Sequence, residues 1–372
     1  MIYFDNGATT FPKPKSVILG VNTCLKKIGG NPARSSHKLS ILASEEIYKT
    51  RECVASLLNV SDPEGVVFTY NATYALNMAI KTMIRERCHV ITSDVEHNSV
   101  IRPLERLKES FGVEYSLYNS DLSPEIAIPP LIREDTRFIV STIASNVSGK
   151  EIDLGALSRV ASKYSLKLII DASQAIGHKN IDLSATPCDA ICAPAHKALF
   201  GIQGTGFAYF RNKNREGDFI EGGSGTNSID TAMPGLLPEG YEAGTLSTVG
   251  IVALRHGIDF VTEIGINNID YHLNKLRKLS EDELRHNKRI ILYPSFGGNL
   301  IFNLEGHTSS ETAMMLDEYN ICTRGGLHCA PSAHRRLGTL DTGTVRVTYS
   351  IMNTPCEVER FVDIVNKISH RK

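Results

Sequence analysis

The pattern of hydrophobic and polar positions predicts short buried strands that alternate with helices. The strand segments are three to five residues long and almost wholly apolar, as strands covered on both faces are. They lie at 66–69, 89–92, 137–141, 168–170, 190–193 and 207–210. Residues 41–58, 75–80 and 250–285 carry apolar side chains at helical spacing. The alternation over 41–210 indicates an α/β fold with a doubly wound sheet.

Two of these strands bring an acid and an amine to one edge of the sheet. Leu168–Ile170 ends at Asp171, and Ala190–Ala193 ends shortly before His196 and Lys197. Open α/β sheets bind ligands at the carboxyl ends of their strands. Pyridoxal phosphate (PLP) needs an amine for a Schiff base with its aldehyde and an anion against its ring nitrogen. A buried ion pair, or a lysine that reaches solvent, fits the spacing equally well.

A turn after the strand at 66–69 predicts a phosphate site. This strand leads through Tyr70 and Asn71 into Ala72, Thr73 and a helix. A helix N-terminus after such a turn cradles phosphate, because free N–H groups and the positive end of the helix dipole face the anion. The Thr73 hydroxyl would add a donor; alternatively, it only caps the helix.

Composition removes several function classes. The 372 residues suffice for a large domain and a smaller one. A net charge of −1 gives no reason to expect nucleic acid or a membrane surface as a partner. The sequence lacks a signal-peptide pattern and a membrane-spanning apolar run, so we expect a cytoplasmic protein. Eight scattered cysteines without a CxxC pair predict neither a metal site nor a disulfide framework.

Six motifs, spread over nearly the whole chain, carry a resemblance to a known family. They are YFDNGATT at 3–10, DASQAIGH at 171–178, PAHK at 194–197, GIQGTG at 201–206, RGGLHC at 324–329 and RVTYSIMNT at 346–354. In this order they resemble the fold-type I PLP enzymes of aminotransferase class V, and within them the SufS-like cysteine desulfurases and selenocysteine lyases. The resemblance implies a large PLP-binding domain, residues 13–250, with a mostly parallel seven-stranded sheet between helices. It also implies a smaller α+β domain, residues 1–12 and 251–372, that carries the cysteine loop and a carboxylate-binding arginine.

The resemblance assigns roles to individual residues. The implied catalytic residues are Lys197, Cys329 and His97; the implied cofactor-binding residues are Ala72, Thr73, His97, Asp171, Gln174, His196, Lys197, Gly244 and Thr245; and the implied substrate-binding residues are Asn146, Arg324 and Arg346. No metal is implied. Gly244 and Thr245 would reach the PLP phosphate of a neighbouring subunit, so the resemblance implies a homodimer with shared active sites. The loop 30–40 is implied to lie near the site and the dimer contact. The segment 222–248 can also be a flexible surface loop.

The cysteine and one arginine have a chemical rationale of their own. A Gly-rich turn leaves Cys329 accessible, and we expect Arg324, His328 and His334 to favour its thiolate, the nucleophilic form. The alternative is an inert buried thiol. The Arg346 guanidinium suits a carboxylate in two-point fashion, whereas an arginine on a strand can also simply face solvent.

Three positions depart from the family pattern. Asn71 stands where the family usually has Gly, and we expect asparagine to tolerate the unusual backbone angles there. Pro194 replaces a Ser or Thr that donates to the phosphate, so His196 and Thr73 must carry more of that contact. Met352 stands where Tyr is common.

We therefore expect a PLP-dependent cysteine desulfurase that converts L-cysteine to L-alanine and takes the sulfur on Cys329 as a persulfide. The sulfur acceptor, in iron–sulfur cluster assembly, tRNA thiolation or selenium supply, cannot be read from the sequence. Three alternatives stay open: a selenocysteine lyase, a C–S lyase or class V aminotransferase that does not use the thiol, and a non-catalytic scaffold with the same fold.

Overall fold

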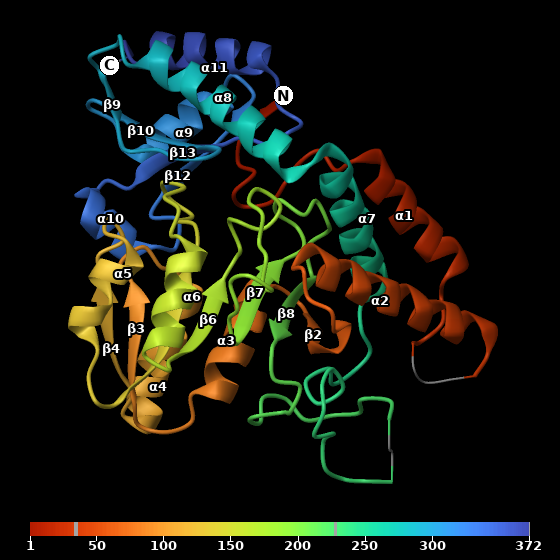
Figure 1. Ribbon diagram of the computed structural model, residues 1–372. Helices are drawn as coiled ribbons and strands as arrows, with labels where there is room; N and C mark the ends of the chain where they lie inside the picture. The colour runs from red at the N-terminus through yellow and green to blue at the C-terminus, as the bar shows by residue number, and fades with distance from the viewer. Residues whose placement is uncertain (33–35, 227–228, 372) are drawn as a thin grey trace.

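A seven-stranded sheet lies at the centre of the computed structural model (Figure 1). Its strands are β2 (Val66–Thr69), β3 (His89–Ser93), β4 (Glu114–Tyr118), β5 (Thr136–Thr142), β6 (Lys167–Asp171), β7 (Ala190–Pro194) and β8 (Gly206–Phe210). The spatial order is β2-β8-β7-β6-β5-β3-β4, and only β8 runs antiparallel to its neighbours. The predicted α/β class and the mostly parallel seven-stranded sheet are confirmed.

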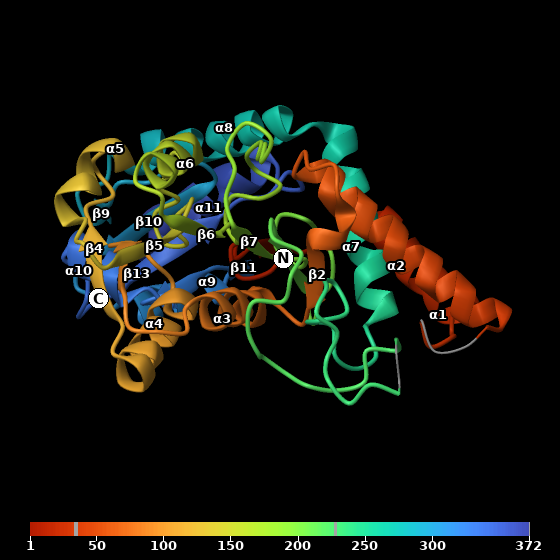
Figure 2. The same cartoon turned by 60° about the horizontal axis from the view of Figure 1, so that its bottom comes forward.

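Helices cover both faces of this sheet because its strands are apolar on both sides. In β6, Leu168 and Ile170 pack into the core on one face and Ile169 packs into the core on the other. The first face is covered by α2 (Lys38–Leu57), α6 (Leu154–Lys163) and α7 (Thr248–Ile264), and the second by α3 (Ala72–Met83) and α4 (Asn98–Phe111). Figure 2 shows α3 and α4 together on one side of the sheet and α6 on the other.

A smaller sheet forms a second unit. Its strands are β9 (Ile290–Leu292), β10 (Asn299–Leu304), β12 (Arg324–Gly326) and β13 (Thr344–Thr348), in the order β12-β13-β10-β9. The helices α8 (Ile266–Leu284), α9 (Ser309–Asp317) and α11 (Pro355–Ile368) flank this sheet. β1 (Ile2–Tyr3) pairs in parallel with β11 (Ile321–Cys322), which ties the N-terminus to this unit. A separate core, with Phe4, Phe302 and Phe361 at its centre, holds the unit together.

Two helices link the cores. Ile251 and Leu254 of α7 pack into the core of the large sheet, whereas Val261 of the same helix packs into the smaller core. The short helix α10 (Pro331–Leu337) lies in sequence between β12 and β13 of the smaller sheet, yet Ala333 packs into the core of the large one. The domain division at residue 250 stays a prediction.

The structure describes residues 1–32, 36–226 and 229–371. Residues 33–35 of the loop 30–40 and residues 227–228 of the segment 222–248 lie outside the described residues. The remaining elements are α1 (Lys15–Lys27), α5 (Pro124–Ala127) and two short 3₁₀ turns at Pro63–Gly65 and Pro129–Leu131. The hydrophobic pattern did not predict α1 or β4, because α1 exposes Ile18, Leu19 and Leu25 and β4 is largely polar.

Candidate active site

The carboxyl ends of the parallel strands meet at a cavity of about 220 Å³. Ten of the predicted site residues line it: Ala72, Thr73, His97, Asn146, Asp171, Gln174, His196, Lys197, Arg324 and Arg346. Three do not: Cys329, Gly244 and Thr245. The parallel strands all end at the same edge of the sheet, which is why residues far apart in the sequence meet here.

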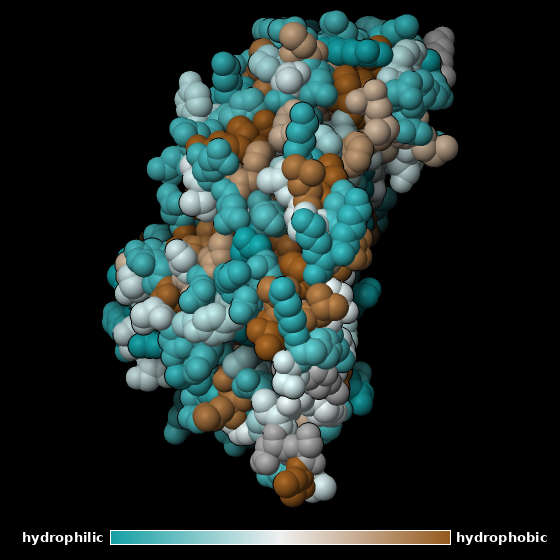
Figure 3. Space-filling view, turned by 90° about the vertical axis from the view of Figure 1, so that its right-hand side faces the viewer, coloured by the Kyte–Doolittle hydropathy of each residue, from teal (hydrophilic) through white to brown (hydrophobic). Residues whose placement is uncertain are grey.

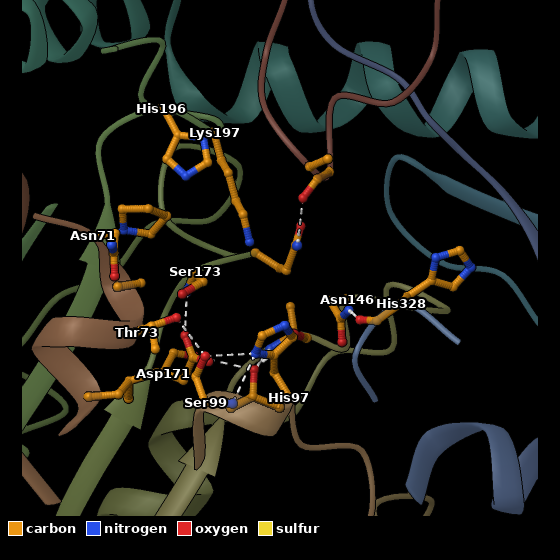
Figure 4. Close-up of a pocket in the computed structure, with 18 of the residues that line it drawn as sticks. Asn71, Thr73, His97, Ser99, Asn146, Asp171, Ser173, His196, Lys197 and His328 are labelled. Carbon is orange, nitrogen blue, oxygen red and sulfur yellow. Dashed lines mark hydrogen bonds between the residues drawn. The ribbon is translucent and has the colours of Figure 1, made fainter. Parts of the chain in front are cut away.

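Lys197 and Asp171 face the same cavity from different strands. Figure 4 shows the Lys197 side chain entering from one side, with Asp171 and His97 across the cavity. Asp171 ends β6 and is buried; one of its oxygens accepts from the Ser173 N–H at 2.8 Å. Burial lowers the pKa of Lys197 to about 8, although the Asp171 carboxylate opposes this shift. The lysine is therefore close to deprotonation near neutral pH, as an amine nucleophile or base must be.

His97 caps the helix α4 and has a defined proton arrangement. Its Nδ1 accepts from the Ser99 N–H at 3.0 Å, so the neutral ring carries its proton on Nε2. Burial lowers the pKa of His97, and the Lys197 and Arg324 charges act in the same direction while Asp171 opposes them. The ring is thus a neutral group that can donate from Nε2.

The N-terminus of α3 borders the cavity. Asn71 caps this helix by accepting from the Tyr74 N–H at 2.9 Å, so the alternative that Thr73 is the cap is wrong. Asn71 has φ −175°, which is extended backbone, so tolerance of unusual angles is not the reason for asparagine here. The Thr73 hydroxyl instead lies 2.7 Å from that of Ser99. Ala72 and Thr73 thus begin the helix beside the cavity, with backbone N–H groups that have no partner in the preceding turn of the helix.

His196 offers a second polar group at this end of the cavity. Its Nδ1 is buried and has no hydrogen-bond partner among the described residues. Burial lowers the pKa of His196 to about 4, and the charges of Lys197 and Lys13 add to this effect. A buried nitrogen without a partner is costly unless a ligand satisfies it. Pro194 also lines the cavity and offers no side-chain donor.

Two arginines lie directly opposite each other on adjacent strands. Arg324 of β12 pairs with Arg346 of β13. Arg346 is 1% exposed, which excludes the alternative of a solvent-facing arginine. Its Nη1 donates to the Asn146 carbonyl at 2.7 Å and its Nη2 to Asp5 at 2.9 Å, whereas its Nε has no partner within the described part of the chain. Like charges directly opposite destabilise a sheet, so this pair favours an anion in the cavity.

Cys329 is exposed and follows directly after His328, which lines the cavity. Both residues have positive φ, 51° for His328 and 58° for Cys329. The left-handed conformation costs a non-glycine residue about 1–2 kcal/mol. Two hydrogen bonds hold it here: the Asn146 amide donates to the His328 carbonyl at 2.6 Å, and the Asn98 N–H donates to the Cys329 carbonyl at 2.8 Å.

The expectation that two histidines favour the Cys329 thiolate is wrong. Figure 4 shows the ring of His328 pointing away from the cavity. Burial lowers the pKa of His328 to about 2 and that of His334 to about 4. Both rings are therefore neutral and add no positive charge, which leaves Arg324 as the one charged member of the predicted set.

Two acids near the site, the half-buried Asp5 and the buried Glu96, were not singled out from the sequence. Asp5 forms an ion pair with Arg346, and it stands in the quoted DNGATT motif. Glu96 is fully buried beside His97 and accepts from the Thr142 N–H at 2.8 Å. Burial raises the pKa of Glu96 to about 8, and Asp171 contributes. A carboxylate at the end of a buried segment was the available signal, as it was for Asp171.

The other predicted residues lie as follows. Gln174 donates from Nε2 to the Gly7 carbonyl at 3.1 Å and so closes one wall of the cavity. Gly244 has φ 91°, a backbone conformation that favours glycine. Gly244 and Thr245 border other hollows on the surface, apart from the Lys197 cavity of the same chain.

The chain belongs to the aminotransferase class-V family, whose family model matches residues 2–361. Within this class, its curated relatives are named as cysteine desulfurases. A probable cysteine desulfurase of Methanothermobacter thermautotrophicus is 30% identical, over 99% of this chain and 94% of the relative. A cysteine desulfurase of Klebsiella pneumoniae is 29% identical, over 99% and 93%.

Solved structures give the same result. The cysteine desulfurase of Thermococcus onnurineus NA1 superimposes with a TM-score of 0.90 at 26% identity, and covers 99% of this chain and 94% of its own. A cysteine desulfurase of Escherichia coli gives 0.88 at 25% identity, with coverage of 98% and 94%. The resemblance seen in the motifs is thus confirmed. No helix in the part of the chain that the structure describes is long and apolar enough to cross a membrane.

Proposed function

We propose that this protein is a PLP-dependent cysteine desulfurase that converts L-cysteine to L-alanine and receives the sulfur on Cys329. One observation carries the proposal: Lys197, Asp171 and two arginines line a single cavity, and an exposed cysteine follows the residue that borders its edge. The similarity of the whole chain to cysteine desulfurases supports it.

The residues of the cavity fit PLP. Lys197 would hold its aldehyde and Asp171 its ring nitrogen, while His196, Thr73 and the start of α3 would hold its phosphate. The His196 Nδ1 supports this assignment, because it is a buried polar atom that lacks a protein partner among the described residues. The buried Oδ1 of Asn146 also lacks such a partner and is available to the substrate. When bound, PLP supplies an electron-withdrawing ring that stabilises negative charge on the substrate.

The chain's own residues carry out proton transfer and hold the substrate. Lys197, with its pKa lowered to about 8, takes the α-proton of the substrate. Arg346 and Arg324 would hold the substrate carboxylate, and Asn146 contacts both Arg346 and the cysteine turn. His97 lies in the cavity wall, where it would be beside the bound cofactor, and it can donate from Nε2.

The sulfur step is a nucleophilic displacement at sulfur. The Cys329 thiolate attacks the substrate sulfur, so an S–S bond forms and the Cβ–S bond breaks. The electron pair of the broken bond stays with the β-carbon, which takes a proton and becomes the methyl group of alanine. Cys329 is thereby oxidised to a persulfide while the β-carbon is reduced, and no further oxidant is required.

A homodimer with shared sites is part of this proposal. Gly244 and Thr245 lie outside their own chain's cavity, which leaves them available to a neighbour's phosphate. Exposed apolar side chains support a subunit contact: Ile18, Leu19 and Leu25 of α1, Leu39, Ile41 and Tyr48 of α2, and Ile229 and Leu236. Figure 3 shows the side of the molecule that carries α1 and α2, with hydrophobic patches among hydrophilic ones.

Alanine release from L-cysteine and L-selenocysteine tests the proposed reaction. The wild type should release alanine from L-cysteine. Cys329→Ala should lose this activity by about 100-fold or more because the nucleophile is missing, yet keep the absorbance of bound PLP. A variant that stays active would indicate a lyase that does not use the thiol, and release from selenocysteine alone would indicate a selenocysteine lyase.

A further inference from the structure

Arg336 joins the helix that follows the cysteine to the strand ends of the large sheet. It lies in α10, seven residues after Cys329. Its Nη1 donates to Asp94 and, at 2.8 Å, to Asn119, and its Nη2 donates to Asp121. We call these four residues the Arg336 clamp.

The clamp reaches the turn that carries His97. Asp94 directly follows β3 and stands three residues before His97. The residue after His97, Asn98, donates its N–H to the Cys329 carbonyl at 2.8 Å. The segment 94–98 thus contacts the segment 329–336 at both of its ends, once through the Cys329 backbone and once through Arg336.

The helix α10 makes only a small apolar contact with the large core, through Ala333 and Leu337. It spans seven residues, and its N-cap residue makes no side-chain hydrogen bond within the described structure. Such a short helix is marginal on its own. Its buried residues are Ala333 and His334, and Leu337 is only partly buried against the large core, so polar contacts add substantially to what fixes its position. Arg336 and Asp94 are only 24% and 19% exposed, which reduces screening by solvent.

The turn between β12 and α10 needs both ends fixed. Its two residues His328 and Cys329 have left-handed backbones, which non-glycine residues keep only where the surroundings impose them. The β12 end is held by its pairing with β13. The other end is held by the hydrogen bond from the Asn98 N–H to the Cys329 carbonyl and continues directly into α10.

We propose that Arg336 is a positioning residue for Cys329: by fixing α10, it holds the Cys329 thiol at a constant position relative to His97 at the edge of the cavity. This inference rests on the proposed desulfurase function for its catalytic consequence. Its structural part, the control of Cys329 by Arg336, does not depend on that function.

The test compares Arg336→Ala with Arg335→Ala, a neighbour in the same helix with the same charge and an exposed side chain. The first readout is the rate at which iodoacetamide alkylates Cys329 in the PLP-loaded protein without L-cysteine, followed by mass spectrometry of the peptide. Arg336→Ala should raise this rate about threefold or more, because the turn loosens. Arg335→Ala should match the wild type.

The second readout separates positioning from general stability. In Arg336→Ala, kcat for alanine release should fall about tenfold, while KM for L-cysteine and the absorbance of bound PLP stay within about twofold of the wild type. The kcat of Arg336→Lys should lie between those of the wild type and Arg336→Ala, because one ammonium cannot reach two carboxylates as a guanidinium fork does.

Equal alkylation rates and equal kcat in the two alanine variants would overturn the inference. If Arg336→Ala does not fold, Arg336→Lys carries the test: an intermediate alkylation rate supports the inference, and a rate equal to that of the wild type contradicts it. A wild type that releases no alanine would reject the proposed function, while the alkylation rates would still decide whether Arg336 controls Cys329.

Discussion

The two sides of the cavity are built differently. On the cofactor side, Asp171 and Lys197 follow adjacent strands of one sheet, and strand pairing alone brings them together. On the thiol side, Cys329 lies on a turn between a strand of the small sheet and a helix on the large one, held by bonds to residues far away in sequence. The residues that would hold the PLP ring are therefore fixed by the core of the large sheet. The position of Cys329, which would receive the sulfur, is fixed by a few polar contacts.

Among the changes on the cofactor side, removal of the Lys197 amine should lower turnover the most. Lys197→Ala loses both the covalent anchor and the base, so turnover should fall by about 1,000-fold or more. Dialysis should also remove PLP more readily than from the wild type, as its absorbance would report. Lys163→Ala, at an exposed lysine of α6, serves as the control. Full activity in Lys197→Ala would refute the assignment of the amine.

Removing the negative charge opposite the lysine should have a smaller effect. Asp171→Asn keeps the shape of the side chain but no longer stabilises a protonated ring, so turnover should fall about 100-fold. PLP should still bind, with a changed pH dependence of its absorbance. Unchanged turnover would contradict the assignment of Asp171 to the ring nitrogen of PLP.

The pH dependence of stability should reveal the buried acid Glu96. Its folded pKa, about 8, lies above the ordinary 4.5, so its contribution is full below pH 4.5 and is lost as pH rises through 8. Between pH 6 and pH 9 the wild type should lose about 3 kcal/mol of unfolding free energy relative to Glu96→Gln, which does not titrate. Urea unfolding of both proteins at the two pH values measures this. If the wild type and Glu96→Gln lose the same unfolding free energy between the two pH values, Glu96 is not the titrating group.

The smallest expected effect concerns the cap of α3. Asn71→Ala removes the bond to the Tyr74 N–H and should cost about 1 kcal/mol, whereas Asn71→Gly should cost only a few tenths. Denaturant unfolding measures both. If Asn71→Ala and Asn71→Gly lose the same unfolding free energy, the side-chain cap does not stabilise the helix. Asparagine would then stand in place of the family's glycine for another reason.

The contrast between residues placed by strand pairing and residues placed by long-range polar contacts also decided what the sequence could predict. Asp171 and Lys197 were found from the pattern itself, because apolar runs locate strand ends and parallel strands end together. Cys329, Arg346 and His97 were singled out by resemblance, with a chemical rationale added for the first two, because their position depends on contacts such as that between Asn146 and His328, 182 residues apart. The burial of His328 and His334, which makes them neutral, and the Arg336 clamp needed the folded chain.

The mass of the Cys329 peptide after addition of L-cysteine tests the central claim most directly. The PLP-loaded wild type should carry one additional sulfur atom on Cys329, removable by a reducing agent, in proportion to the first alanine released. The same protein without PLP should carry none. Alanine formation without any sulfur on Cys329 would contradict the account.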